Sequence, residues 1–91
     1  MIIGKVVGNV WATRKEESLH GLKLLIIKPI DYYSYKEEET LVAADIVGAG
    51  VGEVVLIVKG SSAGKALFNK NSPVDAAIVG IIDEVEVNKS L

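Results

Sequence analysis

The sequence predicts an all-β fold, a small five-stranded barrel of the OB-like kind with one short helix, which assembles as a ring. Short runs rich in valine and isoleucine alternate with turn-forming residues along the chain. Several of these runs are apolar at both parities, so both faces of the strand require burial. The chain has 91 residues and no cysteine, so its core is marginal and partner subunits, rather than disulfides, must supply that burial.

Five strands are expected, over residues 2–12, 22–30, 40–47, 53–59 and 76–87. Gly80 is expected to be a bend or a bulge in the last strand. The polar residues 13–21 and the tyrosine- and acid-rich residues 32–39 are typical of loops. Ser61 is a candidate N-cap of a short helix that ends near Phe68, because its hydroxyl can accept a free amide of the first turn. No linker or repeat divides the chain, so we expect residues 1–91 to form one domain.

Three expected strands have no polar face. Residues 24–27, 54–58 and 76–82 are apolar at both parities. A parallel sheet covers both faces with helices, but this chain has only one short helix to offer. We therefore expect another subunit to cover part of the outer face. The alternative is that these are scattered surface residues of the ordinary kind, and the recurrence of the pattern in three segments favours the first interpretation.

The charge balance argues against a nucleic-acid partner. Ten basic residues stand against twelve acidic ones, for a formal net charge of −2, and the basic residues are dispersed. Nucleic-acid affinity comes largely from clustered basic residues, and OB-type binders usually add several aromatics, which make up only 5% of this chain. The chain also opens without a basic leader and lacks an apolar run of the ~18 residues that span a membrane. We therefore expect a cytoplasmic protein with neither nucleic-acid nor membrane partners.

No residue is expected to be catalytic, to hold a cofactor or to bind a metal. Residues 48–52 have the wrong spacing for a dinucleotide fingerprint and precede a strand instead of a helix. Residues 60–66 are one residue short of a P-loop and place Ala66 where a serine or threonine is needed. His20 is the only histidine, and acids at strand ends such as Asp45 are interpreted as solvated turn residues. The sequence therefore does not predict an enzyme.

Seven short segments, taken together in their order and spacing, carry a specific resemblance. They are residues 4–8, 11–15, 19–25, 42–45, 48–53, 60–63 and 73–83. In these segments the sequence resembles the EutN/CcmL family, the vertex proteins of carboxysomes and of microcompartments for ethanolamine, propanediol and related substrates. The resemblance covers nearly the whole chain.

The resemblance implies a structural protein, a homopentamer that caps the fivefold vertices of a bacterial microcompartment shell tiled by hexameric shell proteins. The residues that match the family's loop around the axial opening are Gly48, Ala49, Gly50, Val51, Gly52 and Glu53. The residues that match its other shared segments, which we expect to serve assembly, are Thr13, Arg14, Lys15, Gly60, Ser61 and Ser62. Gly64 departs from the pattern, because many members carry arginine there, and Lys65 does not replace its fork of donors. No cofactor is implied.

Two other functions remain as alternatives. A soluble OB-like module could bind a small ligand or nucleic acid, although the acidic charge and the few aromatics weigh against it. An enzyme or enzyme subunit comes third, because no nucleophile–base constellation is present.

Overall fold

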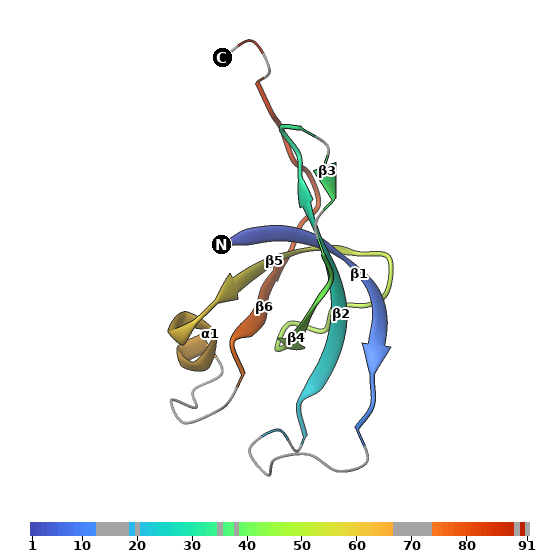
Figure 1. The fold of residues 1–91 in the computed structure, drawn as a ribbon, viewed down its shortest axis with the longest axis vertical. Helices are drawn as coiled ribbons and strands as arrows, with labels where there is room; N and C mark the ends of the chain where they lie inside the picture. Colours follow the sequence, from blue (N-terminus) through green and yellow to red (C-terminus); the bar gives the residue numbers. More distant parts are fainter. Residues whose placement is uncertain are drawn as a thin grey trace.

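Strands dominate the part of the chain that this computed structural model describes, which comprises residues 1–12, 19, 21–34, 36–37, 39–66, 74–88 and 90. In chain order the elements are β1 (Ile2–Val10), β2 (Lys23–Asp31), β3 (Lys36–Glu37), β4 (Leu41–Asp45), β5 (Val54–Lys59), α1 (Ser61–Ala66) and β6 (Ala76–Ile81). Figure 1 shows them as a curled sheet with α1 at one side and the C-terminal segment rising away from it.

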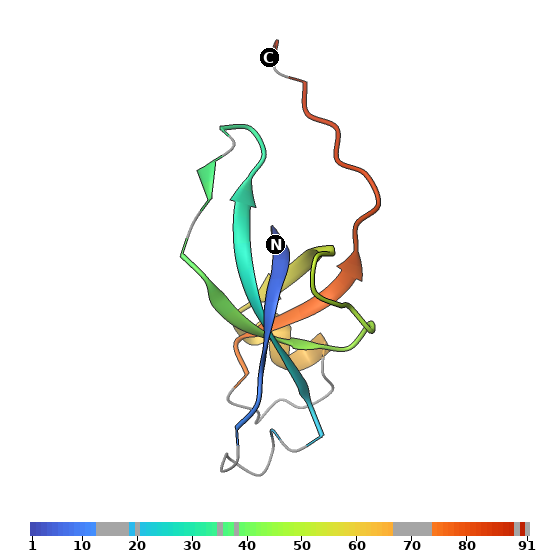
Figure 2. The same cartoon turned by 90° about the vertical axis from the view of Figure 1, so that its right-hand side faces the viewer.

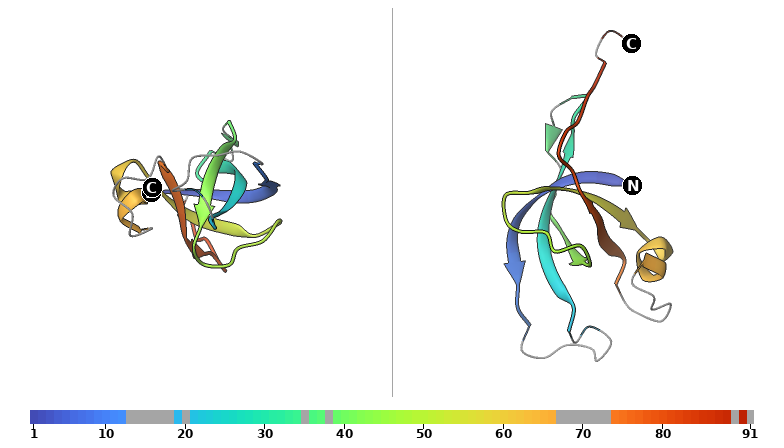
Figure 3. Two further views of the ribbon diagram at one scale, coloured as in Figure 1. Left: turned by 90° about the horizontal axis from the view of Figure 1, so that it is seen from below. Right: turned by 180° about the vertical axis from the view of Figure 1, so that it is seen from behind.

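Five strands close into a barrel, which confirms the predicted all-β, OB-like class. Their order is β1-β5-β6-β4-β2, and β2 pairs back onto β1. Every pairing is antiparallel except that of β4 with β6, which has only two registered pairs, Ala44 with Ala77 and Asp45 with Ile78. The view along the barrel in Figure 3 shows these strands wrapped around one interior.

The interior is filled by one parity of β1, β2 and β5 and by consecutive buried residues of β4 and β6. Successive side chains of a strand point to opposite faces, so residues two apart share the core. The largest fully buried side chains are Val6, Leu25, Ile27, Val55, Ile57 and Ile78. The alternate residues of β2 and β5, such as Leu24, Ile26 and Leu56, are only half-buried in the single chain. The outer faces of these two strands are therefore left partly open, as the doubly apolar pattern predicts.

Gly4 allows β1 and β2 to approach each other closely in this core. A Cβ atom at this position would lie 2.5 Å from Cγ2 of Ile27 and 3.1 Å from the carbonyl oxygen of Lys28. Real Cβ atoms do not come so near to a buried branched side chain, because packing at native density leaves no room to shift. A glycine is therefore required where β1 crosses the middle of the barrel.

The last strand is shorter than predicted. β6 ends at Ile81 instead of continuing to residue 87, because beyond it the backbone leaves the barrel and pairs with no strand of the described chain (Figure 2). The predicted irregularity at Gly80 is confirmed. Leu56 lies opposite Gly80 while Ile57 lies opposite Ile78, so Val79 is an extra, bulged residue.

Two smaller differences concern the loops and the helix. Residues 32–39, predicted as a loop, contain the two-residue strand β3, which pairs with Ile30 and Asp31 at the end of β2. Ser61, predicted as the N-cap, is instead the first residue of the helix. The residue before the helix is Gly60, which has a φ of +68°. The predicted end of the helix near Phe68 lies outside the described residues.

Candidate assembly surface

The glycine-rich segment predicted to surround an axis forms an ordered loop between β4 and β5. Its first half is fixed by the carboxylate of Asp45, at the end of β4. Oδ2 accepts a hydrogen bond of 2.9 Å from the amide of Ala49, and Oδ1 accepts one of 3.1 Å from the amide of Val47. The Ala49 side chain is fully buried in the core cluster. The loop therefore enters the barrel at Ala49 and does not hang free.

Lys23 of β2 closes over this anchor. Its ammonium lies 3.5 Å from Oδ2 of Asp45 and also donates a hydrogen bond to the carbonyl oxygen of Ala49. The Asp45 side chain is only 1% exposed, whereas that of Lys23 is 49% exposed. Burying a carboxylate is costly unless it is paired and hydrogen-bonded. The lysine and the two amides supply that compensation.

The second half of the loop is tied to β1. The amide of Gly52 donates to the carbonyl oxygen of Val6 at 2.8 Å, and the amide of Val6 donates to the carbonyl oxygen of Glu53 at 2.9 Å. Within the loop, Oε1 of Glu53 accepts a hydrogen bond of 2.7 Å from the amide of Gly50. Held at both ends, the loop presents Val51 at its tip, where that side chain is 60% exposed.

Glycine is required in this loop at two positions and not at the third. Gly48 and Gly52 have φ values of +82° and +94°, in the left-handed region that other residues rarely adopt. Gly50 has no positive φ, and a Cβ there would meet only Oε1 of Glu53, at an ordinary 3.5 Å. Among the residues that the structure describes, no contact within a single chain therefore requires a glycine at position 50.

Two apolar outer faces lie on different sides of the barrel. The β2–β4 face consists of Leu24, Ile26 and Val42, with Ile26 directly opposite Val42 across the strands. The β1–β5 face consists of Ile3, Val54 and Leu56, with Ile3 opposite Leu56. Ile46 and Val47 extend the first face to the start of the glycine-rich loop, and both are exposed. Each protomer thus carries two separate surfaces that would gain from being covered.

Gly60 and Ser62, the predicted assembly residues that the structure describes in full, do not lie in or beside the glycine-rich loop. Gly60 and Ser62 stand at the start of α1, which follows β5, whereas the loop precedes it, so the two segments lie at opposite ends of that strand. Ser62 is exposed. Ser61 is the first helical residue, but its side chain lies outside the described part of the structure. Thr13, Arg14, Lys15 and His20 also lie outside the described residues.

The anchor of the loop was missed from the sequence. The prediction of Asp45 as a turn residue is correct in its hydrogen bonds, since an aspartate before a turn commonly accepts amides two residues on. The prediction that it is solvated is wrong, because the side chain is buried. Lys23 gave no local signal, because its role comes from the pairing of β2 with β4, where it lies opposite Asp45.

No group of three or more potential metal ligands gathers among the residues that the structure describes. Within the same part of the chain, no helix has the length and apolar character needed to cross a membrane.

Comparison with known proteins places this barrel and loop in a family. The family model described as "Ethanolamine utilisation protein EutN/carboxysome" matches residues 1–83. The chain belongs to the EutN/CcmL family. The relatives in that family are named as shell vertex proteins, which are structural, and the chain is accordingly a microcompartment shell protein and not an enzyme.

Similarity to individual EutN/CcmL proteins extends over their whole length. The shell vertex protein GrpN of Rhodospirillum rubrum is 45% identical over 86 residues, which cover 94% of this chain and 97% of the relative. The carboxysome vertex protein CcmL of Synechococcus elongatus is 48% identical over 92 residues, 100% of this chain and 93% of the relative. The solved structure of Gloeobacter violaceus CcmL matches with a TM-score of 0.88 at 42% identity, covering 98% and 92% of the two chains.

Proposed function

We propose that this EutN/CcmL protein assembles as a homopentamer that caps the fivefold vertices of a microcompartment shell, where it meets hexameric shell proteins. One observation carries the proposal. The structure described as the pentameric microcompartment shell protein GrpN of Rhodospirillum rubrum matches this fold with a TM-score of 0.85 at 44% identity, covering 97% of this chain and all of that one. At this identity over nearly the whole of both chains, we expect the contact surfaces as well as the barrel to have counterparts in this protein.

The two outer faces support a ring. A closed ring of identical subunits uses heterologous contacts, in which one surface of each subunit meets a different surface of the next. The β2–β4 face and the β1–β5 face provide two such surfaces on different sides of one barrel. Because both are apolar and half-open in the single chain, burying each of them against a neighbouring subunit gains free energy from the hydrophobic effect.

The loop of residues 48–53 is proposed to surround the axis of that ring. Support comes from Gly50, which no contact within its own chain requires to be a glycine. Close approach of five loops around an axis would supply the missing reason, because backbones can then crowd where side chains would collide. The segments 13–15 and 60–62 are proposed to serve assembly as well, with the exposed Ser62 available to a neighbour.

Native mass spectrometry of the wild-type protein tests the proposal. The expected species has five times the 9.7 kDa mass of the chain. A monodisperse monomer at micromolar concentration would refute it. Co-expression with a hexameric shell protein tests the vertex role, because closed polyhedral particles should form only when this chain is present. If they close equally well without it, the chain does not cap vertices.

A further inference from the structure

The segment that follows β6 projects from the barrel as an unpaired strand. Its first residue, Ile82, donates a hydrogen bond of 2.8 Å to the carbonyl oxygen of Val54. Asp83 lies in a bend, and residues 84–88 belong to no helix or strand and pair with no strand of the described chain. Figure 2 shows it rising from the barrel, separated from the arm formed by β2 and β3.

The side chains of this segment alternate as those of a half-buried strand do. In an extended backbone, Val85 and Val87 share one face while Glu84 and Glu86 share the other. Val87 is 38% exposed and Val85 is half-buried in the single chain. An amphipathic extended segment without a partner is the kind of element that docks on a second chain.

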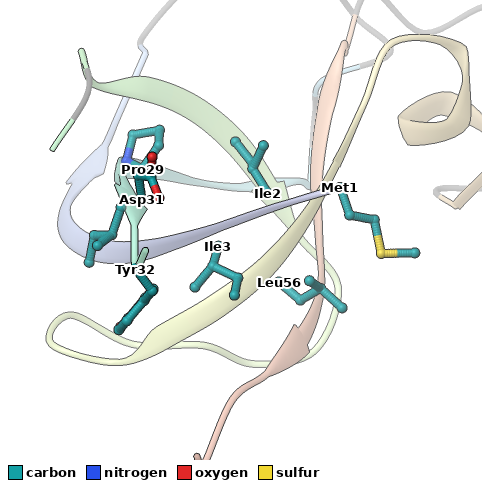
Figure 4. Close-up of a pocket in the computed structure, with 8 residues that line it drawn as sticks. Met1, Ile2, Ile3, Pro29, Asp31, Tyr32 and Leu56 are labelled. Carbon is teal, nitrogen blue, oxygen red and sulfur yellow. The ribbon is translucent and has the colours of Figure 1, made fainter. Parts of the chain in front are cut away.

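An apolar groove lies at the same end of the molecule. It is a cavity of about 430 Å³ where β1, β5 and the end of β2 meet, lined on its apolar side by Met1, Ile3, Tyr32 and Leu56 (Figure 4). Cavities of roughly 300–1,000 Å³ accept several side chains or a small ligand. Tyr32 also borders the recess at the base of residues 82–85, so groove and segment stand side by side at one end of the barrel.

Basic side chains of β1 and β2 flank the groove, whereas residues 82–88 are acidic. Residues 82–88 carry three acidic side chains and no basic one. Beyond the groove on the same outer face, Lys5 lies opposite Lys28 on one side and opposite Val54 on the other. Asp31 also lines the groove, but its Oδ1 already accepts the amides of the turn that follows, at 3.0 Å from Tyr33 and 3.3 Å from Ser34.

We propose that residues 82–88 of one subunit dock in this groove on the adjacent copy of the same chain, with Val87 seated against Ile3 and Leu56. The proposal rests on the proposed homopentamer and says how its neighbours interlock. Rotation about a single axis keeps equivalent points at one level, so surfaces that meet in a ring must lie at similar heights. Segment and groove satisfy this condition because both flank Tyr32. Each subunit contributes one segment to one neighbour and binds the segment of the other neighbour, so the contacts form a closed ring.

Paired cysteines test the contact directly, because the wild-type chain has none. A variant with Ile3→Cys and Val87→Cys should, on mild oxidation, give a reducible ladder of covalent species up to the pentamer. Mixing chains that carry only one of the two substitutions should give covalent dimers and nothing larger. The matched control combines Val87→Cys with Val42→Cys, on the other side of the barrel, and should give no ladder.

The outcomes separate the two proposals. If native mass spectrometry finds pentamers and the Ile3–Val87 pair gives no ladder, or only a disulfide within one chain, the docking is wrong and the proposed function stands. If no pentamer forms at all, both fail. Leu56→Cys replaces Ile3→Cys should the latter variant not fold.

A charge placed on either face of the segment gives an independent measurement. Val87→Asp should raise the concentration at which the ring dissociates by at least tenfold, because it places a carboxylate in the apolar groove. Asn88→Asp adds the same charge to the opposite face and should change the dissociation concentration of the ring less than twofold. Equal effects of the two substitutions would overturn the proposal.

Discussion

Removing the carboxylate of Asp45 should release the glycine-rich loop from the barrel and lower the free energy of unfolding by about 3 kcal/mol. The buried amide of Ala49 and the neighbouring amide of Val47 lose their acceptor in Asp45→Ala. A hydrogen bond to a charged group contributes roughly 1.5–3 kcal/mol, and a buried donor left unpaired costs about 1–3 kcal/mol. The amide of Val47 can form a hydrogen bond with water instead, whereas the buried amide of Ala49 cannot. The loss in the free energy of unfolding therefore comes mainly from Ala49. The half-exposed Lys23 returns to solvent, and its ion pair adds little.

Urea unfolding at one fixed protein concentration measures this loss, because dissociation of a ring makes the midpoint concentration-dependent. Amide hydrogen exchange should become faster at Ala49 and Gly52, at both ends of the loop. Asp45→Asn retains the volume and one acceptor oxygen and should lose less than the alanine variant. Asp75→Ala, which removes an exposed acid directly before β6, is the control and should stay within about 0.5 kcal/mol of the wild type. An Asp45→Ala variant that also stays within that range would refute the anchoring role.

Three glycine substitutions complete the predictions. Gly4→Ala places a methyl group 2.5 Å from Cγ2 of Ile27 and should cost about 1–3 kcal/mol in urea unfolding; an unchanged midpoint would contradict the close approach of β1 and β2. Gly52→Ala forces a side chain into a φ of +94° and should cost about 1–2 kcal/mol, whereas Gly52→Asn should cost less; equal losses would show that the left-handed backbone is not the cause. Gly50→Val should leave the circular dichroism of the barrel unchanged and weaken or constrict the ring, and a ring unaltered in mass and in its axial opening would remove the loop from the axis.

The sequence alone could not specify which face of each strand points into the core. Five strands at their observed places along the chain follow from the spacing of apolar runs and turns, whereas their order in the barrel was not predicted. In β2, however, Leu24, Leu25, Ile26 and Ile27 are equally apolar. The register with β1 sets which parity points inward, because only the contact with Gly4 gives Ile27 its place in the core. That choice depends on a residue 23 positions away in the sequence, which no local pattern contains.

The same dependence on distant partners accounts for the errors. Val85 and Val87 alternate with acids as a strand would, which is why the last strand was predicted to continue past Ile81. Alternation describes a segment that suits a sheet, but a strand exists only where a neighbour accepts its hydrogen bonds. The burial of Asp45 was missed for a similar reason, since its compensating lysine comes from another strand. The sequence predicted the position of the glycine-rich loop between two strands, but not the carboxylate that anchors it.

The parallel contact between β4 and β6 makes the order of folding uneven around the barrel. This contact has only two registered pairs, Ala44 with Ala77 and Asp45 with Ile78, and joins residues 33 positions apart in the sequence. By contrast, β1 and β2 have six registered pairs. Closing a long loop for few hydrogen bonds is unfavourable until the rest of the structure holds the ends together. We therefore expect the hairpins to form before this contact closes, through an open sheet in which the core residues of β6 are uncovered. On this reasoning, the rate at which β4 meets β6 sets how quickly a new subunit can join others.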